Sequence, residues 1–138
     1  ERAKWVEVGA KPAWENWVFE FSNVLPPEEY PIVDIPLSHP LFNIVFEIKE
    51  IPQVPSVGHY EYWAQTGETY EGQPTMDDQP YCRGVFDKKG RLMAVFMFNT
   101  DLGDGWEREG EHEGYFRDFS VKRAYPMGIN IVVYAMTH

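Results

Sequence analysis

The chain has 138 residues, of which 43% are hydrophobic, and this suits one folded domain with a real core. Its formal net charge of -10 argues against nucleic acid as a partner, because nucleic-acid binding needs a basic face. The single cysteine, Cys82, excludes an internal disulfide and a cysteine-based zinc site within one chain.

The acidic residues gather in two segments. Residues 50–78 hold six acids and no lysine or arginine, and residues 99–118 hold seven acids beside Arg108 and Arg117. The composition of both segments predicts loops. We therefore interpret most of these carboxylates as solvated loop residues rather than as a cation site.

No apolar run is long enough to cross a membrane. The longest, near residues 129–136, is far short of the roughly 20 residues that a spanning helix needs. We therefore expect no transmembrane span in this chain. The sequence begins at Glu1 without a visible signal peptide, so we treat it as a processed or incompletely observed product.

The first predicted element is a helix over residues 13–25, preceded by an extended lead-in over residues 1–12. Pro12 suits the first helical turn and Pro26 stops the helix. Apolar side chains recur at helical spacing at Trp14, Trp17, Val18, Phe21, Val24 and Leu25. We expect the aromatic face of this helix to pack on a sheet.

The middle of the chain predicts irregular structure. Residues 26–55 contain seven of the eleven prolines, which favours short extended pieces and rigid turns. Residues 58–80 mix glycine, threonine, glutamine and acids with four aromatic side chains, and we interpret them as a long surface loop. Loops of that length are uncommon unless they are functional or mobile.

The clearest local unit is a β-hairpin over residues 81–98. Its turn lies at residues 87–90, where Gly90 can supply a positive φ. Residues 91–98 carry apolar side chains on both faces, which predicts an interior strand that is covered on both sides.

The last segment, residues 126–137, suits a buried helix or a strand. Ile129, Ile131 and Val132 favour a strand, whereas the length and Pro126 at the start favour a helix, which is our prediction. The chain is thus predicted to be an α/β domain or domain half over residues 1–138. We expect a mixed or mostly parallel sheet with helices on both faces.

The sequence offers no recognisable catalytic motif. The serines lack the glycine-flanked elbow of a nucleophile, and Cys82 enters a strand, where a buried inert thiol is usual. The four histidines do not form a metal-binding spacing. We predict no catalytic residue, no metal and no cofactor.

One loop is the best candidate for a ligand site. Residues 99–107 follow a predicted strand, and open α/β sheets bind ligands at strand ends. The proposed ligand-binding residues are Asn99, Asp101, Asp104 and Trp106, with His39 nearby. An EF-hand is excluded because glycine stands at the fifth position of the loop instead of the sixth. The alternative is that Asn99 and Asp101 bond to their own backbone and shape the loop.

Six short segments, in order over nearly the whole chain, point to a known family. They are residues 34–42 (DIPLSHPLF), 51–56 (IPQVPS), 83–87 (RGVFD), 90–93 (GRLM), 99–107 (NTDLGDGWE) and 128–138 (GINIVVYAMTH). Together they resemble the C-terminal half of the bacterial domain-of-unknown-function four-one-five-nine family. The resemblance implies a flavodoxin-like or amidotransferase-like fold of the class I glutamine amidotransferase superfamily, incomplete at its N-terminal side. It implies no established activity.

The chain departs from these relatives at three points. The sheet-forming half that usually precedes residues 13–25 is missing, so we expect that half or a different protein subunit as a partner. The elbow cysteine of the amidotransferases has no counterpart, and Asn43 stands where family members often have histidine.

These observations favour a non-catalytic binding or scaffold subunit of the bacterial envelope or periplasm, in an assembly associated with the membrane. The aromatic content of 16% agrees with this, because aromatic residues are enriched where proteins meet partners. The alternative function is a hydrolase-like or small-ligand-binding enzyme with its site at residues 99–107. The alternative location is the cytoplasm.

Overall fold

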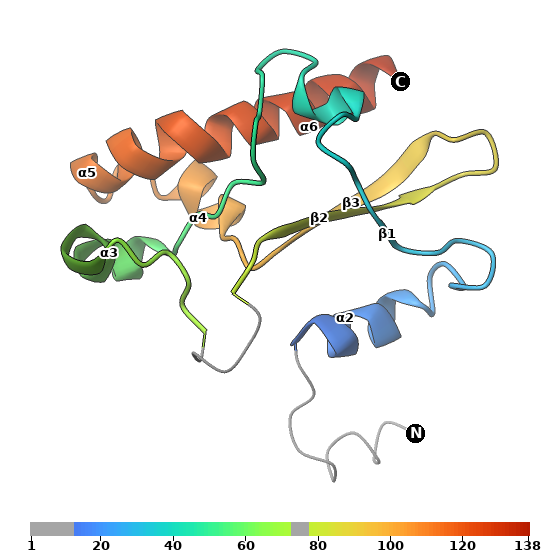
Figure 1. Cartoon of the computed structure of the whole chain (residues 1–138), viewed down its shortest axis with the longest axis horizontal. Helices are drawn as coiled ribbons and strands as arrows, with labels where there is room; N and C mark the ends of the chain where they lie inside the picture. The colour runs from blue at the N-terminus through green and yellow to red at the C-terminus, as the bar shows by residue number, and fades with distance from the viewer. Residues whose placement is uncertain (1–12, 73–77) are drawn as a thin grey trace, which may run out of the picture.

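The computed structural model describes residues 13–72 and 78–138 (Figure 1). The expected lead-in over residues 1–12 lies outside this range. The elements are, in chain order, α2 (Ala13–Phe21), β1 (Val33–Asp34), η1 (Pro40–Phe42), η2 (Val57–His59), α3 (Tyr60–Thr66), β2 (Tyr81–Phe86), β3 (Leu92–Phe98), α4 (Leu102–Glu107), α5 (Glu113–Tyr115), η3 (Phe116–Ala124) and α6 (Tyr125–Thr137). Two of them, η1 and η2, are 3-10 helices, and η3 is a π-helix.

The described strands form one antiparallel sheet in the order β1-β2-β3. The fold is therefore mixed α/β, but the predicted parallel, flavodoxin-like sheet is wrong. The tight turn between β2 and β3 forces these neighbours to run antiparallel, because parallel neighbours need a long crossover. Helices do lie on both faces: Figure 1 shows α6 on one side of the sheet and α2 on the other.

The prediction that residues 91–98 form an interior strand is also wrong, because β3 is an edge of the described sheet. Its two apolar faces have a different cause. Val95 and Met97 pack against the core, whereas Phe96 meets Trp17 of α2 at a ring distance of 4.3 Å. Side-chain burial on two faces says nothing about whether the strand's outer hydrogen-bonding edge has a partner.

The hairpin turn follows from its local chemistry. Gly90 has a φ of 79° and donates its N–H to the carbonyl of Asp87 at 2.9 Å. The Asp87 carboxylate accepts from the backbone N–H groups of Lys89 and Arg91, both at 2.8 Å. A register shift lies between Val85 and Phe86 in the pairing with β3.

Two helices differ from the predicted ranges. The first, α2, ends at Phe21, four residues before the predicted end at residue 25. The predicted loop over residues 58–80 contains the end of η2 and the helix α3, and α3 ends at Thr66 before its C-cap Gly67, which has a φ of 77°. The helix forms because its aromatic side chains find a core partner: Trp63 meets Phe119 at 4.6 Å. Residues 73–77 of that predicted loop lie outside the described range.

The C-terminal region is one continuous helical run from α5 through η3 to α6, with Pro126 inside it. A proline in a helix cannot donate a backbone hydrogen bond and crowds the carbonyl one turn earlier. The wider π-helical turn before it relieves this conflict, and the N–H of Tyr125 bonds to the carbonyl of Ser120, five residues back. The predicted helix over residues 126–137 corresponds to α6.

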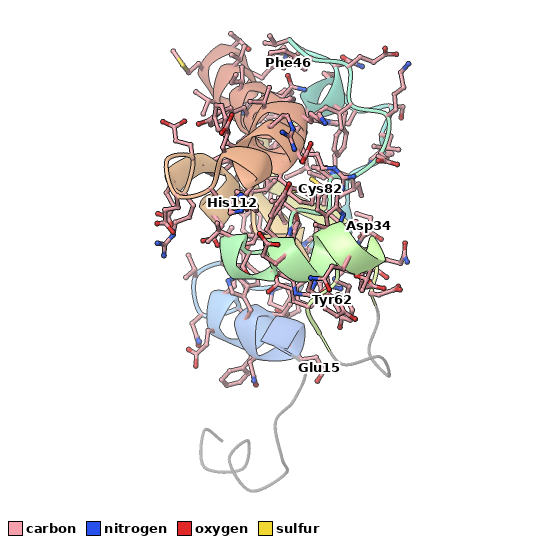
Figure 2. All side chains as sticks on the ribbon, turned by 90° about the vertical axis from the view of Figure 1, so that its left-hand side faces the viewer. Glu15, Asp34, Phe46, Tyr62, Cys82 and His112 are labelled. Atoms are coloured by element: carbon pink, nitrogen blue, oxygen red, sulfur yellow. The ribbon has the colours of Figure 1, made fainter. Side chains whose placement is uncertain are left out.

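The core lies between this helical run and the sheet. Its fully buried side chains include Leu41, Phe42, Tyr115, Phe119 and Met127, each 0% exposed. Figure 2 places Cys82 inside the molecule and Phe46 near α6 at one end. Because the core uses only one side of α6, the other side of that helix is left to form a surface.

Candidate functional site

The predicted ligand loop over residues 99–107 is largely a short helix, α4. Asp101 is its N-cap, and one carboxylate oxygen accepts the N–H of Asp104 at 2.9 Å. The Asp104 carboxylate accepts the N–H of Val57 at 2.8 Å. These two carboxylates hold the backbone together, which agrees with the loop-shaping alternative.

The start of the loop is bound to the segment around Val54. Asn99 has a φ of 55° and donates its side-chain amide to the carbonyl of Gln79 at 2.9 Å. Thr100 accepts the N–H of Val54 at 2.9 Å, and the N–H of Asp101 donates back to the carbonyl of Val54 at 2.7 Å. Asn99, Asp101 and Asp104 therefore lie close together along the chain, with polar atoms engaged inside the protein.

His39 does not join this group. Its ring meets Phe86 at 5.8 Å and Tyr134 at 5.2 Å, and its Nδ1 accepts the N–H of Leu41. Burial lowers the pKa of this imidazole. Tyr134 lies about 9 Å of helix rise beyond Gly128, the α6 residue that Trp106 contacts. The structure thus separates His39 from the loop.

The structure also bears on metal binding. Among residues 13–72 and 78–138, no three side chains of histidine, cysteine, aspartate or glutamate come together in a way that could hold a metal ion.

A second polar cluster, which the sequence did not point to, surrounds Asp118. Its carboxylate accepts from the hydroxyl of Tyr60 at 3.0 Å and pairs with Arg117 and Lys122, both at 2.9 Å. Hydrogen bonds from these two cations hold the pKa of Asp118 well below its usual range. Burial and this same carboxylate raise the pKa of Tyr60. With its oxygens already bonded, Asp118 joins α3 to η3 and is poorly placed to accept a substrate proton.

Trp106 is the predicted residue that reaches a cavity. Its indole N–H donates to the carbonyl of Ala124 at 2.8 Å, which lays the ring against α6. Gly128 makes room for the ring, because a Cβ at this position would lie 2.9 Å from three ring atoms. Trp106 is still 42% exposed, so the ring forms one wall of an open groove.

The groove between α4 and α6 has a cavity volume of ≈ 280 Å³. It is lined by Trp106, Tyr125, Gly128, Ile129, Val132 and Val133. Both polar atoms of its aromatic side chains point to other partners: the indole N–H binds Ala124, and the Tyr125 hydroxyl donates to the carboxylate of Glu109. What remains for a ligand is an apolar surface.

The apolar surface continues along α6 beyond the groove. Ile129, Val132 and Met136 are 41%, 57% and 79% exposed. The opposite side of α6 buries Met127, Asn130 and Tyr134. The helix has no charged residue on either side. A helix that is hydrophobic all round is normally buried on all sides. The outward face of α6 is exposed although its composition favours burial.

One carboxylate bonds to the wall of the groove. Glu109 accepts the hydroxyl of Tyr125, which lines the groove. The nearby Arg108 is paired with Asp104 at 3.6 Å and with Glu111 at 2.5 Å, so its positive charge is already shared. A ligand that fills the groove would meet the Glu109 carboxylate beside Tyr125.

Sequence reasoning missed most of this groove. It named Trp106, but it assigned residues 126–137 to a buried helix and so overlooked Ile129, Val132 and Val133. The absence of charged residues in this segment was the signal that could have revealed the groove. A helix without any charge can pack on the core with one side and bind a partner with the other. No helix in the described parts of the chain is long and apolar enough to span a membrane.

The fold and the groove define a small mixed α/β domain with a short antiparallel sheet and an apolar surface between α4 and α6. The sequence profile of the family described as "Domain of unknown function (DUF4159)" matches residues 7–136, and the chain therefore belongs to this family. Neither a curated protein nor a solved structure matches the chain.

Proposed function

We propose that this chain is a non-catalytic binding module that holds an amphipathic helix of a partner protein in the groove between α4 and α6. The observation that carries this proposal is the open apolar wall formed by Trp106 and the outward face of α6. Exposed apolar patches with polar rims are typical of protein interaction sites.

The shape of the wall favours a helix as the occupant. Its α6 residues, from Tyr125 to Val133, recur at helical spacing and form a straight ridge over about 12 Å, or roughly two turns. Ridges of this kind pack into the side-chain grooves of a second helix. An amphipathic helix in an apolar groove is a recurring mode of peptide recognition.

The charge of the rim favours a basic partner. Glu109 accepts the hydroxyl of Tyr125 in the wall, and the whole chain carries a net charge of -10. An acidic helix would be repelled, whereas lysine or arginine beside the apolar face of the partner would lie close to this carboxylate. The favoured occupant is therefore a helix with one apolar face and basic flanks.

The enzyme alternative has less support. Small-ligand sites combine apolar walls with a few polar groups that converge on the ligand. In the α4–α6 groove, both polar ring atoms bind the protein itself. The carboxylates of Asp101 and Asp104 likewise accept backbone N–H groups.

Two finer points belong to the same proposal. A place at the bacterial envelope or periplasm, in an assembly associated with the membrane, rests on the family resemblance alone. The relation to the class I glutamine amidotransferase superfamily, with this chain as the C-terminal half of a larger domain, has weaker support because the observed sheet is antiparallel. The structure of a longer family member would support that relation if parallel strands lay on either side of the strand that corresponds to β2.

The test is a binding titration with a designed helical peptide of about 18 residues that has leucines on one face and lysines on its flanks. Fluorescence anisotropy of the labelled peptide should show saturable binding in the micromolar range. The variant Val132→Glu should weaken binding about tenfold or more, because it puts a charge on the apolar wall. A peptide with glutamates in place of the lysines should also bind more weakly.

The matched control is Val24→Glu, since Val24 is 70% exposed and follows α2, away from the groove. This variant should bind the lysine peptide as the unaltered chain does. Circular dichroism would verify that both variants stay folded. Equal affinity of Val132→Glu and the unaltered chain, or no binding at about 200 µM peptide, would contradict the proposal.

A further inference from the structure

A second cavity, separate from the α4–α6 groove, lies between residues 46–52 and the junction of η3 with α6. Its volume is ≈ 340 Å³, within the range of about 300 to 1,000 Å³ that is typical of small-ligand pockets. Figure 1 shows the chain segment between η1 and η2 running beside the C-terminal helical run at this place. The cavity and the groove share no lining residue.

Apolar side chains form one part of the cavity wall. They belong to Phe46, Ile48, Pro52 and Pro126. Ile48 packs against the core, and the two prolines have rigid rings, so this part of the wall is well fixed. None of these side chains can form a hydrogen bond, and they therefore favour an apolar group of a ligand.

Five charged side chains line the same cavity, and three of them are paired within the protein. The Lys49 ammonium lies 3.4 Å from the carboxylate of Glu47, and the Lys122 ammonium lies 2.9 Å from the carboxylate of Asp118. The charges of these three residues are therefore matched by opposite charges before any ligand binds.

The other two charged residues of the cavity are Arg123 and Glu50. Within residues 13–72 and 78–138, neither of them forms an ion pair, with each other or with another residue. Both also line a neighbouring cavity of ≈ 420 Å³, so they stand where two cavities meet. A positive and a negative group thus border one space without neutralising each other.

The guanidinium of Arg123 is held in place from inside the protein. One N–H donates to the carbonyl of Gln53 at 2.8 Å, and the guanidinium carbon lies 5.4 Å from the centre of the Phe119 ring. This is its one hydrogen bond to the described residues, whereas a guanidinium has five N–H donors. A fixed planar group with unused donors is suited to bind a carboxylate.

We propose that this cavity binds a free α-amino acid with an apolar side chain. The carboxylate of the ligand pairs with Arg123, and its ammonium group pairs with Glu50. Its side chain contacts the apolar part of the wall. A dicarboxylate would bring a negative charge to Glu50, and a diamine would bring a positive charge to Arg123, so the zwitterion is the ligand that matches both residues. This site does not depend on the groove or on its helical partner.

The first test is a titration of the full 138-residue chain, labelled with nitrogen-15, with L-leucine. The backbone amide signals of Ile48, Glu50 and Arg123 should shift and saturate with a dissociation constant of about 10 µM to 1 mM. No saturable shift at about 10 mM leucine would overturn the inference. Shifts confined to Ile129 and Val132 would also overturn it, because they would place leucine in the α4–α6 groove.

Two analogues test the need for both charges of the ligand. N-acetyl-L-leucine lacks the ammonium charge, and L-leucinamide lacks the carboxylate. Each should bind about tenfold or more weakly than leucine, because one of the two ion pairs is lost. Affinities equal to that of leucine would show that only the apolar side chain is recognised, and would overturn the proposal.

Two variants assign each charge of the ligand to its residue. Glu50→Gln should weaken leucine binding about five- to tenfold and should not weaken binding of N-acetyl-L-leucine, which has no ammonium charge to lose. Arg123→Gln should weaken leucine binding about tenfold and should not weaken binding of L-leucinamide. Equal losses for leucine and for the matching analogue would contradict these pairings.

The matched controls are Glu47→Gln and Lys49→Gln. They remove the same kinds of charge from the wall of the same cavity, but from residues that already pair with each other. Each should change the affinity for leucine by less than about threefold. A loss in Glu47→Gln as large as in Glu50→Gln would show that only net charge matters, and would overturn the assignment.

Arg123→Gln also removes the bond to Gln53, so circular dichroism would verify that this variant is folded. Arg123→Lys keeps the positive charge but loses the planar fork, and it should bind leucine with an affinity between those of the unaltered chain and Arg123→Gln. Full affinity in both variants would overturn the role of Arg123. None of these outcomes affects the peptide titration of the groove, so the two proposals fail separately.

Discussion

Asn130 of α6 binds the backbone of Phe46 through both halves of its side-chain amide. Its oxygen accepts the N–H of Phe46 at 2.9 Å, and its nitrogen donates to the carbonyl of Phe46 at 2.8 Å. The same oxygen accepts the N–H of Val45 at 3.2 Å. Asn130 is 0% exposed, so one buried amide satisfies three backbone groups of a proline-rich segment that has no sheet partner there.

We expect Asn130→Ala to lower the free energy of unfolding by about 2 to 4 kcal/mol, because it leaves three backbone groups without their side-chain partner and opens a cavity in the core. Urea denaturation followed by circular dichroism would measure this change. Asn43→Ala is the control, since Asn43 is exposed and belongs to the same segment. A loss of less than 1 kcal/mol for Asn130→Ala would mean that water replaces the amide.

The close approach of α4 to η3 requires glycine at position 105. A Cβ at Gly105 would lie 2.4 Å from the Cβ of Ala124, which is itself 0% exposed. We expect Gly105→Ala to destabilise the protein by about 1 to 3 kcal/mol, because one helix must move. Gly110→Ala, which has nothing within 4 Å, should stay within about 0.5 kcal/mol of the unaltered chain in the same urea measurement.

The carboxylate of Asp118 should make stability depend on acid pH. Its pKa is lowered in the folded state by hydrogen bonds from Arg117 and Lys122, and the side chain is 14% exposed. A lowered folded-state pKa stabilises the protein above the unfolded-state pKa of about 4, and this stabilisation is lost as the pH falls toward the folded value. Stability should therefore decrease on acidification.

The check is the thermal midpoint of Asp118→Asn and of the unaltered chain between pH 7 and pH 3. We expect the variant to be less stable at pH 7 and the difference to shrink below about pH 4, because the unaltered carboxylate then takes up a proton. Glu28→Gln, at an exposed position before β1, should show a much smaller difference at pH 7. A pH-independent difference for Asp118→Asn would contradict the role of the charge.

Cys82 should be unreactive in the folded protein. Its side chain lies in the core cluster, and burial, with a smaller effect from the Asp34 carboxylate, raises the pKa of the thiol to about 12. Since the thiolate is the reactive form, modification by an aromatic disulfide reagent at neutral pH should be about a hundredfold slower than in denaturant. Equally fast labelling in both conditions would show that β2 opens readily.

Local chemistry accounts for the elements that the sequence predicted most directly. Gly90 permits the hairpin turn through its positive φ. Pro126 lies near the start of α6. Each of these signals acts over a few residues, because it works through φ, ψ and hydrogen bonds within one turn. The loop-forming role of Asp101 was visible in the same way, since it caps the helix that follows it.

The pairing of β1 with β2, the edge position of β3 and the helix α3 were decided by tertiary structure. The apolar side chains of β3 show only that both faces of the strand are covered. Hydropathy therefore could not tell whether β3 is an edge or an interior strand. The aromatic residues of α3 form a helix where Phe119 is available to pack against Trp63. The groove is also tertiary, because it arises where Trp106 meets Gly128 across a 22-residue separation and the core covers only the other side of α6. Which face of an uncharged helix is buried depends on partners far away in the sequence, and these come together only in the folded chain.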